Sequence, residues 1–213
     1  MSDPISVRAR FERFPATVKG AFIFRGEDPD PHQVVLHGAR VTAVAAGGSS
    51  GDVPLSPVTL DVVPHRDVFV PFELPISDLD PGWYSLVCDV DVDGTTASYD
   101  GGRRFAVAWP RATVRRGVVR VDRSVALGDS AVRIEQLDLA GESSKLHLLV
   151  EPPGPVTVKL SADGRRLDVL ETDLDEATGR VKVTAYPILR SASSVRIELK
   201  RRGADASLDV TLD

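Results

Sequence analysis

LDPGWYSLVCDVDVDG, residues 79–94, alternates apolar and polar side chains over most of its length. Such a period of two is typical of a β-strand that buries one face, because successive side chains of a strand point to opposite sides. Asp89 and Asp91 lie on the polar face. Asp93-Gly94 then predicts a tight hairpin turn, since both residues adopt positive φ at low cost. The predicted inward face consists of Tyr84, Leu86, Cys88, Val90 and Val92.

The same period of two extends over most of the chain. Residues 68–76 alternate in this way, and Pro71 and Pro75 on the outer face predict a strand at the edge of a sheet, because proline has no N–H for a second neighbour. The one helical candidate, residues 173–177, is too short to matter. Short strands with a turn about every 8 to 12 residues are typical of antiparallel sandwiches. The other predicted strands span residues 17–24, 34–45, 58–63, 105–109, 118–121, 132–139, 146–150, 156–160, 181–185, 195–199 and 208–212, with a Gly/Ser/Pro loop over 47–57.

Length and charge predict two domains. The chain has 213 residues, which suits two domains of about 100 residues each. Residues 1–110 carry 15 acidic and 9 basic side chains, a net charge of −6, whereas residues 111–213 carry 16 and 17, a net charge of +1. The dipeptide Trp109-Pro110 marks the change, because proline ends a strand ladder. We therefore expect an N-terminal β-sandwich over residues 1–110 and a C-terminal β-sandwich over residues 111–213.

Composition excludes several classes of protein. Hydrophobic residues make up 42% and charged residues 27% of the chain, which is typical of a globular protein rather than a disordered one. No apolar run reaches the roughly 18 residues that a membrane span requires, and residues 1–13 do not resemble a signal peptide. We therefore expect a cytoplasmic protein of bacterial type, with no membrane contact. Cys88 is the single cysteine, which excludes an internal disulfide and a thiolate-rich zinc module.

The stretch from Leu79 to Tyr84, followed by the alternating Leu86, Cys88 and Val90, resembles the turn into strand F of immunoglobulin-like and fibronectin-like domains. In this resemblance Tyr84 takes the position of the tyrosine corner. Antibody domains carry a cysteine where this chain has Leu86, so the chain departs from the disulfide-bearing branch. The resemblance implies an all-β fold of two tandem antiparallel immunoglobulin-like β-sandwich domains. It implies no particular function, because such sandwiches host many.

Two further patterns concern the layout of the chain. Residues 70–75, VPFELP, together with the two-sandwich layout, are similar to arrestin-like proteins, including the bacterial sporulation-control members. That resemblance implies an adaptor. Residues 34–64 and 125–153 also share an order of strand, second apolar stretch, Gly-Ser loop and strand ending in proline. This order suggests that the halves are duplicated copies of one sandwich, and the sequence leaves the question open.

Four aspartates are the candidate metal ligands. Asp89, Asp91, Asp93 and Asp100 match the spacing of an EF-hand calcium loop, in which carboxylates at alternate positions surround the ion. The segment departs from that loop because strands rather than helices flank it, and because its last position is an aspartate instead of a bidentate glutamate. The alternative interpretation is a solvated strand face that runs into a hairpin, with at most a weak cation site at the strand end.

A second group combines histidines with acids: Glu27, Asp28, Asp30, His32, His37 and His65. Imidazole and carboxylate groups bind zinc or act as general acid and base, and the prolines in residues 28–32 would hold side chains outward. The alternative for His37 is a buried, hydrogen-bonded histidine, because it alternates with Val35 and Ala39. His147 belongs to the other half and gains no nearby partner from the sequence.

Basic residues gather around the junction of the two halves: Arg103, Arg104, Arg111, Arg115, Arg116, Arg120 and Arg123. Clustered arginines neutralise phosphates, but a nucleic-acid site is expected to add exposed aromatics or a basic domain, and neither is evident here. The interleaved valines favour arginines that decorate the outer face of linking strands. The sequence therefore disfavours nucleic acid as a partner.

Motifs for catalysis are missing from the sequence. There is no Gly-x-Ser-x-Gly elbow, no phosphate loop and no GxGxxG segment after a strand, and Cys88 on the inward face predicts an inert apolar filler. We expect a non-catalytic protein-interaction or structural module without a cofactor. Its partner would be another protein of unknown identity, and its oligomeric state stays open. The alternatives are a cation- or small-ligand-binding sandwich that uses the loops 26–33 and 89–100, or an arrestin-like adaptor.

Overall fold

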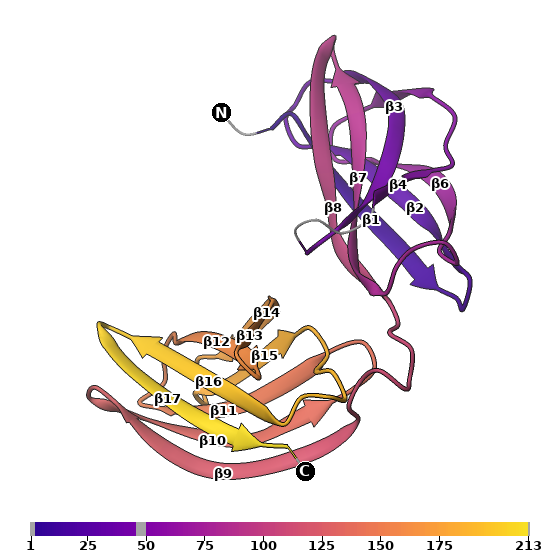
Figure 1. Cartoon of the computed structure of the whole chain (residues 1–213). Coiled ribbons are helices and arrows are strands. Elements are labelled where there is room, and N and C mark those ends of the chain that lie inside the picture. The colour runs from indigo at the N-terminus through magenta and orange to yellow at the C-terminus, as the bar shows by residue number, and fades with distance from the viewer. Residues whose placement is uncertain (1–2, 46–49, 213) are drawn as a thin grey trace. The chain divides into compact units, whose positions relative to one another are not determined.

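The chain is built from antiparallel strands, as its period of two predicts. The computed structural model describes residues 3–45 and 50–212 (Figure 1). Within these ranges it contains seventeen strands and no helix, and every pairing between two strands is antiparallel. The described residues accordingly hold no helix of the length and apolarity that crossing a bilayer requires. The all-β prediction is therefore confirmed.

The chain divides into two compact units, Met1–Val107 and Ala108–Asp213. Each unit has its own hydrophobic cluster, and the two clusters share no residue. Whether residues 1–110 and 111–213 fold as separate domains stays a prediction. Below, the two parts are called the N-terminal unit and the C-terminal unit.

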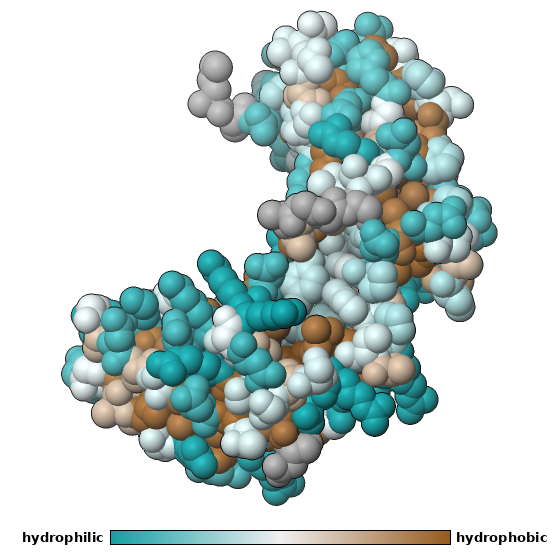
Figure 2. Space-filling model, viewed as in Figure 1, coloured by the Kyte–Doolittle hydropathy of each residue, from teal (hydrophilic) through white to brown (hydrophobic). Residues whose placement is uncertain are grey.

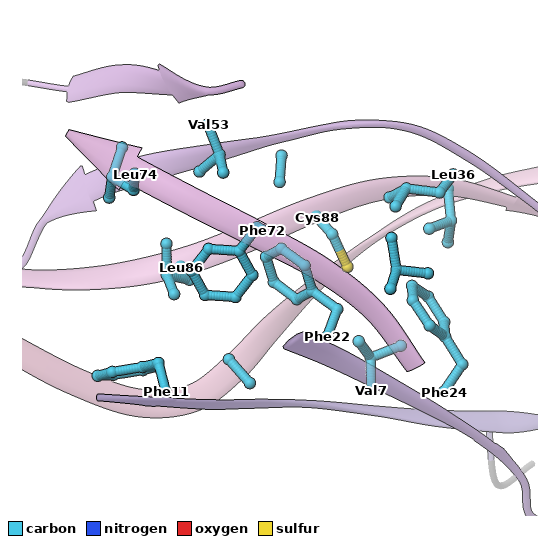
Figure 3. Packing of buried hydrophobic residues seen from close by; sticks show 14 of the residues in the cluster. Val7, Phe11, Phe22, Phe24, Leu36, Val53, Phe72, Leu74, Leu86 and Cys88 are labelled. Carbon is cyan, nitrogen blue, oxygen red and sulfur yellow. The ribbon is translucent and has the colours of Figure 1, made fainter. Parts of the chain in front are cut away.

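The N-terminal unit packs two sheets face to face. One sheet has the order β1-β2-β6, the other has the order β4-β3-β7-β8, and β5 pairs with β3 beside β4. Phe22 and Phe72, with ring centroids 5.0 Å apart, lie side by side between the sheets, and Cys88 is directed into the same cluster (Figure 3). The strands are β1 (Ile5–Arg13), β2 (Thr17–Gly26), β3 (His32–Ala43), β4 (Ser50–Val53), β5 (Val58–Val62), β6 (Asp67–Pro75), β7 (Gly82–Val92) and β8 (Thr95–Val107).

The predicted register of the central strand β7 is confirmed. Its inward side chains are all buried: Tyr84, Leu86, Cys88, Val90 and Val92. The Tyr84 hydroxyl donates a 2.8 Å hydrogen bond to the carbonyl of Asp80, four residues earlier, as a tyrosine corner requires. Asp93 and Gly94 have φ of 50° and 82° and form the tight turn into β8. The proline-bearing β6 lies at the edge of its sheet, as predicted.

The C-terminal unit also packs two sheets around one core, but with a different strand order. Its sheets run β14-β15-β11-β10-β9 and β13-β12-β16-β17. Leu148 and Val183 come from the first sheet and Leu160 and Ile197 from the second, and all four are buried in one cluster. The strands are β9 (Gly117–Leu127), β10 (Ser130–Leu139), β11 (Ser144–Glu151), β12 (Thr157–Ala162), β13 (Arg165–Leu167), β14 (Val169–Asp175), β15 (Arg180–Ala185), β16 (Ser194–Arg201) and β17 (Ala204–Thr211).

The structure differs from the sequence-based expectations for residues 173–177 and for the duplication of the halves, and it describes only part of the predicted loop 47–57. Residues 173–177 form no helix, because β14 runs to Asp175 and its carboxylate then accepts hydrogen bonds from Ala177 and Thr178, which closes a hairpin turn. The hypothesis of duplicated halves finds no support in the topology, since the two units differ in strand order. The predicted loop 47–57 contains β4 and lies partly outside the described residues, which omit 46–49.

Replacing Tyr84 by phenylalanine removes the hydroxyl that satisfies the carbonyl of Asp80. We expect the free energy of unfolding of the N-terminal unit to fall by about 1 kcal/mol or somewhat more, because a buried partner is left unpaired. Urea denaturation followed by the fluorescence of Trp83, in a Trp109→Phe background, measures this unit alone. Tyr99→Phe, on a partly buried residue of β8, is the control, and an equal loss in both variants would contradict the prediction.

Candidate functional site

The fold brings the two predicted site segments, loops 26–33 and 89–100, onto one sheet. β3 pairs with β7, so that Val34 lies opposite Val92, and β7 returns through a tight turn into β8. The aspartates at alternate positions of β7 therefore face basic side chains of β3 on one side and hydroxyl groups of β8 on the other. We call this set of cross-strand contacts the aspartate ladder: Asp28, His32, His37, Arg40, Asp89, Asp91, Asp93, Thr96 and Ser98.

His32 bridges two carboxylates at one end of the aspartate ladder. Its Nε2 lies 2.7 Å from Oδ1 of Asp28, and its Nδ1 lies 2.6 Å from Oδ2 of Asp93. The other oxygen of Asp93 accepts a 2.9 Å hydrogen bond from the backbone N–H of Gln33. The hydrogen bonds to Asp93 and Asp28 raise the pKa of His32 and lower the pKa values of both carboxyl groups. The imidazole, only 9% exposed, thus ties the loop before β3 to the turn after β7.

Asp89 and Asp91, the two aspartates of β7, each contact a basic side chain of β3 and a hydroxyl group of β8. Asp91 lies 2.8 Å from Nε2 of His37 and accepts a 2.7 Å hydrogen bond from the Thr96 hydroxyl. Asp89 forms an ion pair with Arg40 and accepts a 2.5 Å hydrogen bond from the Ser98 hydroxyl. The hydrogen bond from Thr96, followed by that from His37, lowers the pKa of Asp91. The hydrogen bond from Ser98, followed by that from Arg40, lowers the pKa of Asp89. Asp89 and Asp91 therefore each have a basic partner of their own, whereas Asp28 and Asp93 share His32.

This arrangement differs from a calcium loop. Residues 89–92 and 95–100 lie in the paired strands β7 and β8. Their backbone is therefore extended, and it does not form the loop in which a calcium ion is coordinated by backbone carbonyls. Asp100 accepts a 2.8 Å hydrogen bond from the backbone N–H of Gly102 and takes no part in the ladder. Within the described ranges, no group of three or more histidine, cysteine or acidic side chains is placed to hold a metal. The contacts instead fix the register of β3 against β7.

Other residues of the candidate set lie apart from the ladder. Glu27 accepts a hydrogen bond from the Ser6 hydroxyl, and Asp30 donates its backbone N–H to Asp28. His65 is exposed, with φ of 57°. His147, in the C-terminal unit, lies 2.8 Å from Asp138, a partner on the neighbouring strand that sequence spacing alone does not reveal. Cys88 is buried, and burial raises the pKa of its thiol to about 12, so it stays protonated.

The predicted arginine cluster separates into different environments. In the N-terminal unit, the guanidinium of Arg103 lies over the ring of Phe11, 4.9 Å from its centroid. In the C-terminal unit, Arg111, Arg115 and Arg116 line a hollow of about 710 Å³ together with Arg190. Arg190 was absent from the sequence-based cluster because it is far away along the chain. We call this feature the arginine hollow; its other lining residues are Ala112, Val114, Gly117, Val118, Val119 and Leu139.

A short antiparallel bridge between Val114 and Leu189 assembles the arginine hollow. The backbone N–H of Arg190 donates to the carbonyl of Thr113 at 2.9 Å, and that of Arg115 donates to the carbonyl of Ile188 at the same distance. These bonds hold residue 190 beside residues 111–116. Figure 2 shows dark teal, strongly hydrophilic side chains gathered at the end of the C-terminal unit where the chain enters β9.

The four guanidinium groups differ in how firmly they are held. Arg115 is partly buried, and its Nε donates to the carbonyl of Ala192 at 2.9 Å. Arg116 lies against Gly141, where an added Cβ would come within 2.4 Å of its Nη2. Arg111 and Arg190 are exposed, as is Arg116. None of the described residues that line the hollow is acidic. The site is therefore a concentrated positive charge beside apolar valine and leucine side chains.

The bridge formed by His32 makes the stability of the N-terminal unit depend on pH. The folded-state pKa of His32 is raised above its ordinary value of 6.5, so the bridge contributes fully below pH 6.5 and its contribution declines as pH rises through the raised pKa. Asp28 and Asp93 have lowered pKa values, so their contribution is present above 3.8 and is lost as pH falls through the lowered values. We therefore expect the bridge to stabilise the N-terminal unit most between pH 3.8 and pH 6.5, where the imidazole is protonated and both carboxyl groups are ionised.

Melting temperatures measured across this pH range test the bridge. We expect the difference between wild type and His32→Gln to be largest between about pH 4 and 6.5 and to shrink toward pH 9. His65→Asn is the matched control, because His65 is exposed and asparagine tolerates its positive φ. Parallel profiles for wild type and His32→Gln would contradict the prediction.

Calcium is expected to leave the aspartate ladder unchanged. A cation at Asp91 would have to displace His37, and the neighbouring carboxylates have partners of their own. We expect no shift of the melting temperature in millimolar calcium, because a ligand stabilises a protein only as far as it binds the folded state. The measurement compares wild type with Asp91→Asn, and a shift of several degrees that disappears in the variant would favour the cation-binding alternative.

Comparison with known proteins adds no family. No protein-family model matches the chain, and no curated protein matches it significantly. Among solved structures, the conserved domain protein from Bacillus anthracis aligns with a TM-score of 0.36 and 12% identity, covering 100% of this chain and 88% of that one. A marsupial T cell receptor aligns with a TM-score of 0.26 and 11% identity, covering 99% of this chain and 63% of that one. Neither likeness is high enough to carry an argument about function.

Proposed function

We propose that this chain is a non-catalytic protein-interaction module and that the arginine hollow is its contact site. The observation that carries the proposal is the set of guanidinium groups around one hollow, in which Arg111, Arg116 and Arg190 are exposed and none of the described lining residues is acidic. Like charges that line one hollow repel one another, and a ligand of opposite charge relieves the repulsion. Arginine is also the charged residue that protein interfaces favour most. The hollow therefore has the chemistry of a docking site.

The polar groups of the N-terminal unit support a structural role for that unit. His32, His37 and Arg40 are each engaged by a carboxylate of the aspartate ladder. A catalytic histidine needs a free nitrogen within reach of a substrate proton, whereas both ring nitrogens of His32 are occupied. The Cys88 thiol is buried and protonated, so it lacks the thiolate that a nucleophile requires. We infer that the ladder holds the sandwich together and leaves binding to the other unit.

We also propose that the N-terminal unit is an immunoglobulin-like sandwich. Strands A, B and E of such domains share one sheet and strands C, F and G share the other. β1, β2 and β6 occupy the first set of places, and β3, β7 and β8 occupy the second. The hydrogen bond of Tyr84 lies on β7, the strand that corresponds to F. The C-terminal unit has another strand order, so this proposal is limited to the N-terminal unit.

Capture of partners from an extract of the source organism tests the proposed function. We expect the tagged full chain to retain a protein partner that the double variant Arg116→Gln/Arg190→Gln loses, because two of the exposed charges are gone. The double variant Arg165→Gln/Arg166→Gln is the matched control, since it removes the same charge from exposed positions outside the hollow. If the Arg116/Arg190 variant retains the same partners as wild type, the hollow is not the contact site.

A further inference from the structure

We propose that the arginine hollow binds an acidic peptide segment in extended form, with apolar side chains between its carboxylates. This inference rests on the proposed function and names the class of partner for the same site. Three features of the hollow lead to it: the supply of guanidinium groups, the apolar lining, and the position of the hollow beside the first residues of an edge strand.

The guanidinium groups select carboxylates. Each guanidinium presents N–H groups in a planar fork that matches a carboxylate at two points. Arg111, Arg116 and Arg190 are exposed, and none of the three has an ion pair with a described residue. Arg115 adds a fixed positive charge, because its side chain is tied to the carbonyls of Ala192 and Leu212. The hollow therefore accommodates more than one acidic group at a time.

The apolar lining distinguishes a peptide from a simple anion. Val118 is 60% exposed and Val119 is partly exposed, whereas Val114 and Leu139, which also line the hollow, are already buried. An inorganic phosphate would leave Val118 in contact with water, and a volume of about 710 Å³ is far larger than such an ion needs. Stacking of nucleobases calls for aromatic side chains, and none lines the hollow. Aliphatic side chains of a peptide would cover the valines.

The position of the hollow favours an extended ligand. Gly117, Val118 and Val119 begin β9, which is the last strand in the order of its sheet. On one side these residues pair with residues 137–139 of β10. On the other side no strand of the described ranges pairs with them. An extended peptide bound at this edge would present alternate side chains to the arginines and to the valines.

Binding of synthetic peptides to the purified full chain tests the inference. The probe is a fluorescently labelled hexapeptide of alternating glutamate and leucine, and binding is measured by fluorescence anisotropy. We expect this peptide to bind, a glutamine–leucine peptide not to bind, and a glutamate–serine peptide to bind at least about tenfold more weakly, because it buries no apolar side chain. We also expect the affinity to fall as salt is added, because the contacts are between charges.

Variants locate the binding site. We expect Arg116→Gln and Arg190→Gln each to weaken binding of the glutamate–leucine peptide about tenfold, the usual effect of losing one charged hydrogen-bond partner. Arg166→Gln, outside the hollow, is the matched control and is expected to bind as wild type does. Unchanged melting temperatures show that the variants fold. Equal affinity of wild type and both hollow variants would overturn the inference.

Competition experiments separate the ligand classes. Inorganic phosphate that displaces the peptide at equal concentration, or a single-stranded oligonucleotide that binds more tightly than the peptide, would overturn the inference in favour of those ligands. Failure of the peptide to bind, together with loss of the native partner in Arg116→Gln/Arg190→Gln, would refute this inference and leave the proposed function standing. If the peptide does not bind and the Arg116→Gln/Arg190→Gln variant keeps the native partner, both this inference and the proposed function are refuted.

Discussion

Sliding β7 by one residue against β3 would turn Asp89 and Asp91 into the core and expose Leu86 and Cys88 to water. Because side chains of a strand alternate, such a slip reverses every residue at once. The pairing of β3 with β7 thus determines which half of the alternating sequence builds the core of the N-terminal unit. The aspartate ladder reinforces this register from the outer face, since its ion pairs form only when the correct residues lie opposite each other.

The alternation of β7 is also why so much of the N-terminal unit follows from the sequence. The inward position of Tyr84 was predicted from the local alternation and its corner position from the resemblance to strand F of immunoglobulin-like domains, while the prolines of β6 predicted its place at a sheet edge. The EF-hand spacing of Asp89 to Asp100 has the same origin, because a strand face with alternate aspartates reproduces the odd positions of a calcium loop. Spacing along one strand carries no information about which side chains the neighbouring strand supplies.

The arginine hollow and the strand order of the C-terminal unit depend on contacts between segments that are distant along the chain, and the sequence did not predict them. Arg190 lies beside Arg115 and Arg116 because Val114 and Leu189 form an antiparallel bridge. No local sequence pattern predicts that bridge. The strand order of the C-terminal unit was missed for the same reason, since a period of two identifies strands without naming their neighbours. Residues 173–177, which the sequence offered only as a short helical candidate, form a strand end and a hairpin turn, because the aspartate that closes the turn is equally common at helix starts.

The two units differ in how their charged side chains are paired, and the recognition that we propose for the arginine hollow depends on this difference. In the aspartate ladder each carboxylate contacts a basic side chain, and Asp28 and Asp93 share His32. In the hollow, Arg115 is held by carbonyls and supplies a fixed charge, whereas the exposed arginines must be ordered by whatever binds. Ordering a long side chain costs about 0.5 to 1.5 kcal/mol, which offsets much of each ion pair. We therefore expect neither charge nor apolar burial alone to hold the ligand: carboxylates select and steer it, and apolar side chains over Val118 add the rest of the affinity.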